Sequence, residues 1–219
     1  MIRRRTAILL SGRGSNMVAL LHAAAAPDFP AEIALVLSNK PGAGGLALAA
    51  AAGIRSVAVD QRLYRGDRQA HERAIAAELD SAGIEIVCLA GYMRLLTPWF
   101  VERYAGRMLN IHPSLLPAFP GLDTHARALA AGVKLHGCTV HLVTETMDEG
   151  PILAQAAVPV LPDDTEDTLA ERVLAQEHRM YPLALRLFAA GNLASPAQGT
   201  PPSAGTVLSN PLPAPPALS

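Results

Sequence analysis

The order of apolar and polar positions in the first half of the chain predicts alternating strands and helices. Short apolar runs, each typical of a buried strand, recur between longer stretches with helical spacing. The expected strands are Thr6–Leu10, Ile33–Leu37, Arg55–Val59, Ile84–Ala90 and Arg107–Ile111, and the expected helices are Met17–Ala26, Gly45–Ala52 and Asp67–Ser81. Ile84–Ala90 is the most apolar strand, which suggests a central position buried on both faces. This alternation favours an α/β fold with a Rossmann-like, mostly parallel twisted sheet and helices on both faces.

The pattern changes in the second half of the chain. A Pro-rich run, His112–Gly121, leads to a short expected helix at Thr124–Ala131. His136–Thr144 and Pro151–Val160 are two strand patterns joined by a segment too short for a helical crossover. We therefore expect antiparallel pairing near the C-terminal end of the sheet. Asp164–Ala190 has apolar residues at spacings of three and four, which predicts a long helix with one face in the core.

Composition separates a folded part from a tail. The chain has 219 residues, of which 50% are hydrophobic, and this is enough for a sizeable core. Residues 192–219 carry no charged side chain and are rich in Pro, Ala, Ser and Gly. Such a segment buries too little apolar surface to fold. We expect one domain over residues 1–191 and a disordered tail over residues 192–219.

Charge, cysteine spacing and the length of apolar runs restrict the class of protein. The formal net charge is −1, so no basic excess favours nucleic acid. No uncharged apolar run approaches the roughly 20 residues of a membrane span or the core of a signal peptide. Cys88 and Cys138 sit in apolar contexts without C-x-x-C spacing, as expected for buried free thiols in a reducing compartment. The histidines show no metal-binding spacing. We expect a cytoplasmic protein with no metal and no membrane or nucleic-acid partner.

A glycine-rich loop, Gly12–Asn16, lies between the first strand and the first helix. Glycines let the backbone approach an anion closely, and the N–H groups at a helix start attract it, so the loop is a candidate phosphate site. A tight strand–helix turn without a ligand is equally compatible with a lone G-x-G. A dinucleotide site is disfavoured because Met17 replaces the third glycine of G-x-G-x-x-G. The second strand also ends in Ser38-Asn39-Lys40 rather than in an acidic residue.

Three polar residues are candidates for acid–base chemistry. Asn110 and His112 share one face at the end of a strand, because side chains alternate along a strand. An amide can donate to a developing oxyanion, and an imidazole can transfer protons near neutral pH. Asp148 lies in the segment between the last two strands, and a carboxylate near His112 would raise the pKa of the ring. A packed histidine and an ordinary turn aspartate are the alternatives when each residue is considered singly.

Seven motifs that occur in a fixed order give the chain a specific resemblance. They are Ser11–Asn16, Leu37–Lys40, Leu89–Leu96, Leu109–Pro117, His136–His141, Asp148–Ile152 and Gln176–His178. Together they strongly resemble the phosphoribosylglycinamide formyltransferase family of folate-dependent formyltransferases, over roughly Ala7 to Gly191. The Asn-x-His-Pro-Ser-Leu-Leu-Pro run is shared with other 10-formyltetrahydrofolate enzymes, whereas the Gly-Arg-Gly-Ser-Asn loop narrows the choice.

The resemblance implies an enzyme of purine biosynthesis. It would transfer a formyl group from its co-substrate, 10-formyltetrahydrofolate, to the amine of 5'-phosphoribosylglycinamide. Residues 1–191 would form the formyltransferase catalytic domain, its partners would be small molecules, and the protein would be a monomer or a homodimer. The alternative is a 10-formyltetrahydrofolate hydrolase, which usually carries an additional N-terminal regulatory domain. The first strand begins so close to Met1 that we expect no such domain.

The resemblance also implies site residues, each by its match to a family motif. The implied catalytic set is Asn110, His112 and Asp148, with His112 as the proton donor and Asp148 supporting its charged state. The implied contacts to the phosphate and ribose of the substrate are Gly14, Ser15, Asn16 and Glu177. The implied folate contacts are Arg68, Met93, Arg94, Leu95, Leu96, Thr144 and Asp148.

Overall fold

The computed structural model describes residues 2–193, and seven strands form one mixed sheet in the order β3-β2-β1-β4-β5-β6-β7. The strands are β1 Arg4–Leu10, β2 Ala31–Ser38, β3 Ser56–Ala58, β4 Ile86–Leu89, β5 Met108–His112, β6 Leu135–Leu142 and β7 Ile152–Pro159. The pairs from β3 to β5 are parallel, and the β5–β6 and β6–β7 pairs are antiparallel. The predicted fold class is confirmed, and β4 is the middle strand, as its apolar sequence predicted.

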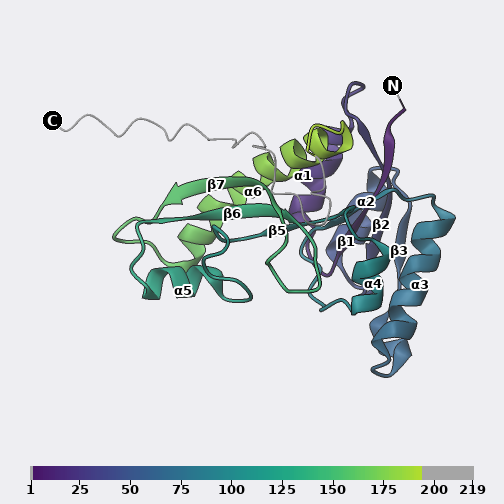
Figure 1. Ribbon diagram of the computed structural model, residues 1–219, viewed down its shortest axis with the longest axis horizontal. Helices are drawn as coiled ribbons and strands as arrows, with labels where there is room; N and C mark the ends of the chain where they lie inside the picture. The colour runs from purple at the N-terminus through teal and green to yellow at the C-terminus, as the bar shows by residue number, and fades with distance from the viewer. Residues whose placement is uncertain (1, 194–219) are drawn as a thin grey trace.

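Helices cover both faces of the sheet (Figure 1). They are α1 Ser15–Ala24, α2 Gly44–Ala51, η1 Gln61–Tyr64, α3 Arg68–Ser81, α4 Pro98–Arg103, α5 Thr124–Ala130 and α6 Glu166–Ala189. One core lies between the sheet and α1, α2, α5 and α6, and a second lies between the sheet and α3 and α4. Along β1, Ile8 and Leu10 enter the first core and Ala7 and Leu9 the second, as strand alternation requires.

Several boundaries differ from the predicted ones, and two elements were not predicted. Helix α1 begins at Ser15 rather than Met17, because Gly14 adopts the left-handed conformation that ends the loop. The segment between β4 and β5 contains α4, which Thr97 precedes and Pro98 opens. The short η1 helix is capped by the Asp60 carboxylate, which accepts a hydrogen bond from the Arg62 backbone N–H. The predicted tail over residues 192–219 lies, from residue 194 onward, outside the described residues.

The antiparallel half of the sheet has one apolar and one polar face. Leu109 and Ile111 of β5 point into the core beneath α6, together with Val140 of β6. The alternate residues pair across the strands on the opposite face, where Asn110 lies opposite His141 and His112 opposite Thr139. Helix α6 packs along β6 and β7 on the apolar side (Figure 1). The fold therefore directs the predicted amide and imidazole away from the main core.

Other sequence-based expectations have separate outcomes. Cys88 and Cys138 are free and buried, and burial raises the pKa of each thiol to about 12, so neither supplies a thiolate near neutral pH. Among the described helices, none combines the length and apolar character that a membrane crossing needs. Residues 2–193 contain no group of three or more His, Cys, Asp or Glu side chains arranged to hold a metal ion. The absence of a metal in the working protein stays a prediction.

Candidate functional site

The three predicted catalytic side chains lie together at the polar face of β5. His112 Nδ1 lies 3.4 Å from Asp148 Oδ2. His141 Nε2 lies 3.6 Å from Asp148 Oδ1 and 3.1 Å from Asn110 Nδ2. The side chains of His112, Asp148 and His141 are each less than a tenth exposed. A half-buried amide, two buried imidazoles and one buried carboxylate thus form a continuous polar cluster.

His141 orients the Asn110 amide. The Nδ1 atom of His141 lies 2.9 Å from the Leu142 carbonyl oxygen, a distance at which the ring N–H donates. When Nε2 carries a lone pair it accepts one N–H of Asn110, and when it carries a proton it pairs with Asp148 Oδ1 instead. An amide group has two N–H bonds, so the second is available to a ligand.

Asp148 joins two loops at the cluster. It has a positive φ of 58°, and its Oδ2 accepts the Gly121 backbone N–H at 2.8 Å. Burial alone would raise the pKa of Asp148. The neighbouring His141 ring, the Gly121 N–H and the charge of His112 together outweigh burial and hold the pKa below its ordinary value. Asp148 is therefore a turn residue, as one alternative proposed, and also an ionised partner of two histidines.

Burial and the Asp148 charge act on the pKa of His112 in opposite directions. Burial lowers the pKa of His112, and the opposing influences of the Phe119 carbonyl and Asp148 only reduce this shift. The predicted influence of the carboxylate is confirmed, because the Asp148 charge raises the pKa of His112, but burial is the larger influence and makes the net shift downward. His112 Nε2 lies 3.0 Å from the Phe119 carbonyl oxygen, to which it donates. The Nδ1 atom therefore faces Asp148 and is the position where a second proton is stabilised.

The predicted phosphate loop has the geometry of an anion site. Gly14 has φ 81°, and a Cβ atom added there would lie 3.0 Å from Gly45 Cα, so the turn requires glycine. The backbone N–H groups of Ser15, Asn16 and Met17, in the first turn of α1, have no hydrogen-bond partner within residues 2–193. Exposed N–H groups at a helix start attract anions.

The predicted substrate contacts Asn16 and Glu177 meet directly. Asn16 Nδ2 donates to Glu177 Oε2 at 2.7 Å and thereby links α1 to α6. Burial raises the pKa of Glu177, and the Asn16 hydrogen bond only partly opposes this. Asn16 Oδ1 is buried and has no hydrogen-bond partner among the described residues, which is unusual for a buried amide.

The predicted folate segment, Met93–Leu96, is fixed from three directions. The Met93 backbone N–H donates to Ser11 Oγ at 2.8 Å, and Arg94 Nη1 donates to Gln61 Oε1 at 2.7 Å. Just beyond the segment, the Thr97 backbone N–H donates to Glu72, a fully buried carboxylate of α3. The Met93 and Leu95 side chains are exposed, so the held backbone presents apolar surface to solvent.

The remaining predicted folate contacts lie at the surface. Arg68 is the first residue of α3, is exposed, and makes no side-chain hydrogen bond or ion pair within residues 2–193. Thr144 Oγ1 donates to the Thr146 carbonyl oxygen in the loop that carries Asp148. Neither residue is drawn into the buried cluster, and their folate contacts stay predictions.

Known proteins match this chain over most of its length. A family model described as formyl transferase matches residues 4–185. The phosphoribosylglycinamide formyltransferase of Escherichia coli (strain K12) is 45% identical over 186 residues, which cover 85% of this chain and 87% of that protein. The trifunctional purine biosynthetic protein adenosine-3 of Homo sapiens is 47% identical over 191 residues, and the match spans 87% of this chain but only 19% of the human protein.

A solved structure extends the comparison to three dimensions. The crystal structure of phosphoribosylglycinamide formyltransferase from Brucella melitensis is 63% identical in sequence and superposes with a TM-score of 0.82. The match covers 86% of this chain and 97% of the Brucella chain.

Proposed function

Because the chain belongs to the formyl transferase family, we propose that it transfers the formyl group of 10-formyltetrahydrofolate to the amine of 5'-phosphoribosylglycinamide in purine biosynthesis. The products are formylglycinamide ribonucleotide and tetrahydrofolate. The observation that carries the proposal is the meeting of Asn110, His112 and Asp148 at the polar face of β5. These are the side-chain types that direct acyl transfer to an amine requires.

The residues present fit both ligands. Ser15 and Asn16 offer free backbone N–H groups to a phosphate, and the Glu177 carboxyl group can accept from ribose hydroxyls. The unpartnered Asn16 Oδ1 is an acceptor that a ligand donor would satisfy. Exposed Met93 and Leu95 suit the flat, largely apolar face of a pterin. We assign this activity to residues 1–191.

The roles of the cluster follow from its protonation. The folate co-substrate supplies the formyl carbon that the substrate amine attacks. Asn110 donates its free N–H to the oxygen on which negative charge develops, while His141 holds the amide in that orientation. The charged His112 ring carries a transferable proton on Nδ1, and Asp148 stabilises that charge. As the bond between the formyl carbon and N10 of the folate breaks, the attacking amine gives up one proton and N10 takes one, so that tetrahydrofolate leaves. The low pKa of the ring in the free enzyme makes it a ready proton donor once charged.

An acceptor-competition assay tests the proposal. The purified protein is mixed with 10-formyltetrahydrofolate and offered 5'-phosphoribosylglycinamide, water alone or initiator methionyl-tRNA, and formylated product and tetrahydrofolate are measured. We expect rapid release of tetrahydrofolate only with the ribonucleotide. Equal release in water would favour the alternative, a 10-formyltetrahydrofolate hydrolase, and formylation of the tRNA alone would contradict the substrate.

The compartment in which the enzyme works is inferred from its reactants and its cysteines. Both reactants are small molecules, and buried free thiols suit a reducing compartment, so we infer a cytoplasmic enzyme. We retain a monomer or a homodimer as the assembly. Gel filtration with light scattering tests it, and a larger assembly would contradict it.

A further inference from the structure

Tyr181 of α6 has a buried hydroxyl group that the proposed chemistry does not use. The residue is fully buried, and its hydroxyl lies 3.0 Å from the Leu89 carbonyl oxygen and 3.1 Å from the Leu109 carbonyl oxygen. Because a hydroxyl has one proton, it shares that proton between the two acceptors in a three-centre hydrogen bond. Burial raises the pKa of Tyr181 well above its ordinary value, so the group remains a donor near neutral pH.

The two carbonyl groups lie where two strands of the site separate. The last pair of the parallel β4–β5 ladder is Leu89 with Asn110. After β4 the chain turns at Gly91, which has a positive φ of 70°, and continues into the folate segment Met93–Leu96. Strand β5 continues instead beside β6. The Leu89 carbonyl therefore lies at the entry to the folate segment, and the Leu109 carbonyl belongs to the peptide bond that leads to Asn110.

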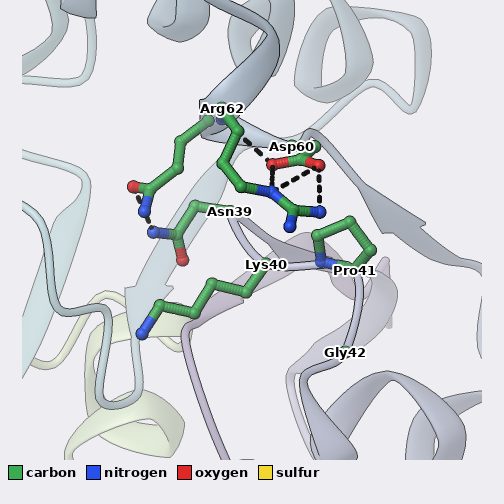
Figure 2. Close-up of a pocket in the computed structure, with 7 residues that line it drawn as sticks. Asn39, Lys40, Pro41, Gly42, Asp60 and Arg62 are labelled. Atoms are coloured by element: carbon green, nitrogen blue, oxygen red, sulfur yellow. Dashed lines mark hydrogen bonds and ion pairs between the residues drawn. The ribbon is translucent and has the colours of Figure 1, made fainter. Parts of the chain in front are cut away.

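A second set of contacts holds the folate segment from the opposite direction. Ser11 Oγ, just after β1, accepts the Met93 backbone N–H and donates to Asn39 Oδ1 at 2.6 Å. Asn39 Nδ2 in turn donates to Gln61 Oε1 at 2.9 Å (Figure 2). These contacts run from the folate segment toward the ends of β2 and β3, and none of them reaches β5. The Tyr181 hydroxyl, in contrast, joins β4 to β5 directly.

The same turn of α6 also reaches the predicted substrate loop. Glu177 lies one helical turn before Tyr181, so the two side chains project from the same side of the helix. Glu177 Oε2 accepts from Asn16 Nδ2 at 2.7 Å, at the start of α1. One turn of α6 thus contacts the phosphate loop, the entry to the folate segment and the peptide bond before Asn110. An anchor that only attached α6 to the sheet would need one acceptor, whereas Tyr181 has one from each strand.

We propose that Tyr181 is a positioning residue for formyl transfer, whose hydroxyl sets the separation between the folate segment and Asn110. The inference rests on the proposed function. Each ligand binds to its own segment, so the affinity for either ligand alone does not depend on that separation. The transfer step does depend on it, because a displacement of reacting groups by about 1 Å can lower a rate by about 10². Tyr181 itself is fully buried and takes no part in bond making.

Separate measurement of catalysis and binding in Tyr181→Phe tests the proposal. Phe keeps the ring that fills the first core, so we expect the variant to fold. Turnover is measured at saturation with both substrates. Dissociation constants are measured for 5'-phosphoribosylglycinamide alone and for 10-formyl-5,8-dideazafolate alone. We expect kcat per folded molecule to fall about tenfold, while both dissociation constants change by less than about twofold. The unfolding temperature also falls, because a buried hydrogen bond is lost.

Three further variants separate positioning from stability. Thr165→Ala removes the side-chain cap at the far end of the same helix, which lowers the unfolding temperature without touching β4 or β5. Tyr104→Phe removes the hydroxyl of another buried tyrosine, which lies in the second core on the other side of the sheet. Tyr181→3-fluorotyrosine keeps the hydroxyl donor at the original position. We expect all three to retain the wild-type kcat per folded molecule.

The possible results have distinct meanings. A wild-type kcat in Tyr181→Phe would overturn the inference, and so would an equal loss of kcat in Thr165→Ala or in the fluorotyrosine variant. Weaker binding of either ligand with kcat unchanged would also overturn it, because the hydroxyl would then serve affinity rather than alignment. Absence of formyl transfer by the wild-type protein would contradict the proposed function instead.

Discussion

The two faces of the β5–β6 pair use the same backbone for different purposes. On one face, Leu109 and Ile111 pack with Val140 under α6. On the other, Asn110 and His112 project from the same five-residue strand toward Asp148. Rigid packing on the apolar face holds the polar groups in place, which is what acyl transfer through directed hydrogen bonds requires.

Two buried carboxylates make the difference between the faces clearer. Burial raises the pKa of Glu177, which lies on α6 beside the apolar core and has Asn16 as its side-chain partner. Burial also acts on Asp148, but His141, the Gly121 N–H and His112 lower its pKa. Partners rather than depth decide whether the pKa of a buried carboxylate rises or falls. The polar face therefore stabilises the charged form of its carboxylate, whereas burial beside the apolar core disfavours the charged form of Glu177.

The largest expected effect is loss of catalysis on the polar face. Asn110→Ala and His112→Ala each remove one group that we assign to stabilising the developing oxygen or supplying the proton. Loss of one such donor typically lowers turnover by about 10²–10³. Each variant should lose at least this much in kcat while its thermal unfolding stays close to that of the wild type. Near wild-type turnover in either variant would contradict the assigned roles.

The adjacent residue on the apolar face should show the opposite pattern. Leu109 is fully buried, and Leu109→Ala leaves a cavity beneath α6. We expect the free energy of unfolding to fall by about 2–5 kcal/mol, measured by urea titration, with kcat per folded molecule little changed. If kcat fell strongly although the variant was fully folded, packing on the apolar face and catalysis on the polar face would not be independent.

Glu177→Gln should increase the free energy of unfolding at neutral pH and weaken the binding of the substrate. A raised pKa in the folded state means that wild-type stability falls as the pH rises above about 4.5 and through the folded-state pKa. The neutral variant lacks this loss, so it should be more stable at pH 7 by about 0.5–2 kcal/mol, with the difference disappearing towards pH 4. Its KM for 5'-phosphoribosylglycinamide should rise. Equal pH profiles of the unfolding temperature would contradict the buried charge.

Local patterns in the sequence predicted much of the fold and part of the site. Alternation along β5 placed Asn110 and His112 on one face, and the short connection after β6 predicted the antiparallel pair. Helix α4 was missed because its six residues are too few to show a helical period. A Thr followed by Pro, at Thr97 and Pro98, was the available signal, since Pro favours the first position of a helix.

Residues whose roles depend on long-range register were not predictable from spacing. His141 contacts Asn110 only because β6 pairs antiparallel to β5 in one particular register. Glu72 supports Thr97 across 25 positions of sequence, and Gln61 joins Asn39 to Arg94. The upward effect of Asp148 on the His112 pKa was predicted, but its net direction was not predictable, because burial is a property of the folded molecule.

The convergence of His112 and Asp148 is the central claim, and a pH titration of the His112 ring by NMR tests it most directly. Burial places the wild-type pKa below the ordinary 6.5, and the Asp148 charge raises it from a still lower value. Removing that charge in Asp148→Asn should therefore lower the pKa of His112 further. An unchanged or higher pKa in the variant would show that the carboxylate and the imidazole do not act together in solution, and the proposed proton transfer would then fail.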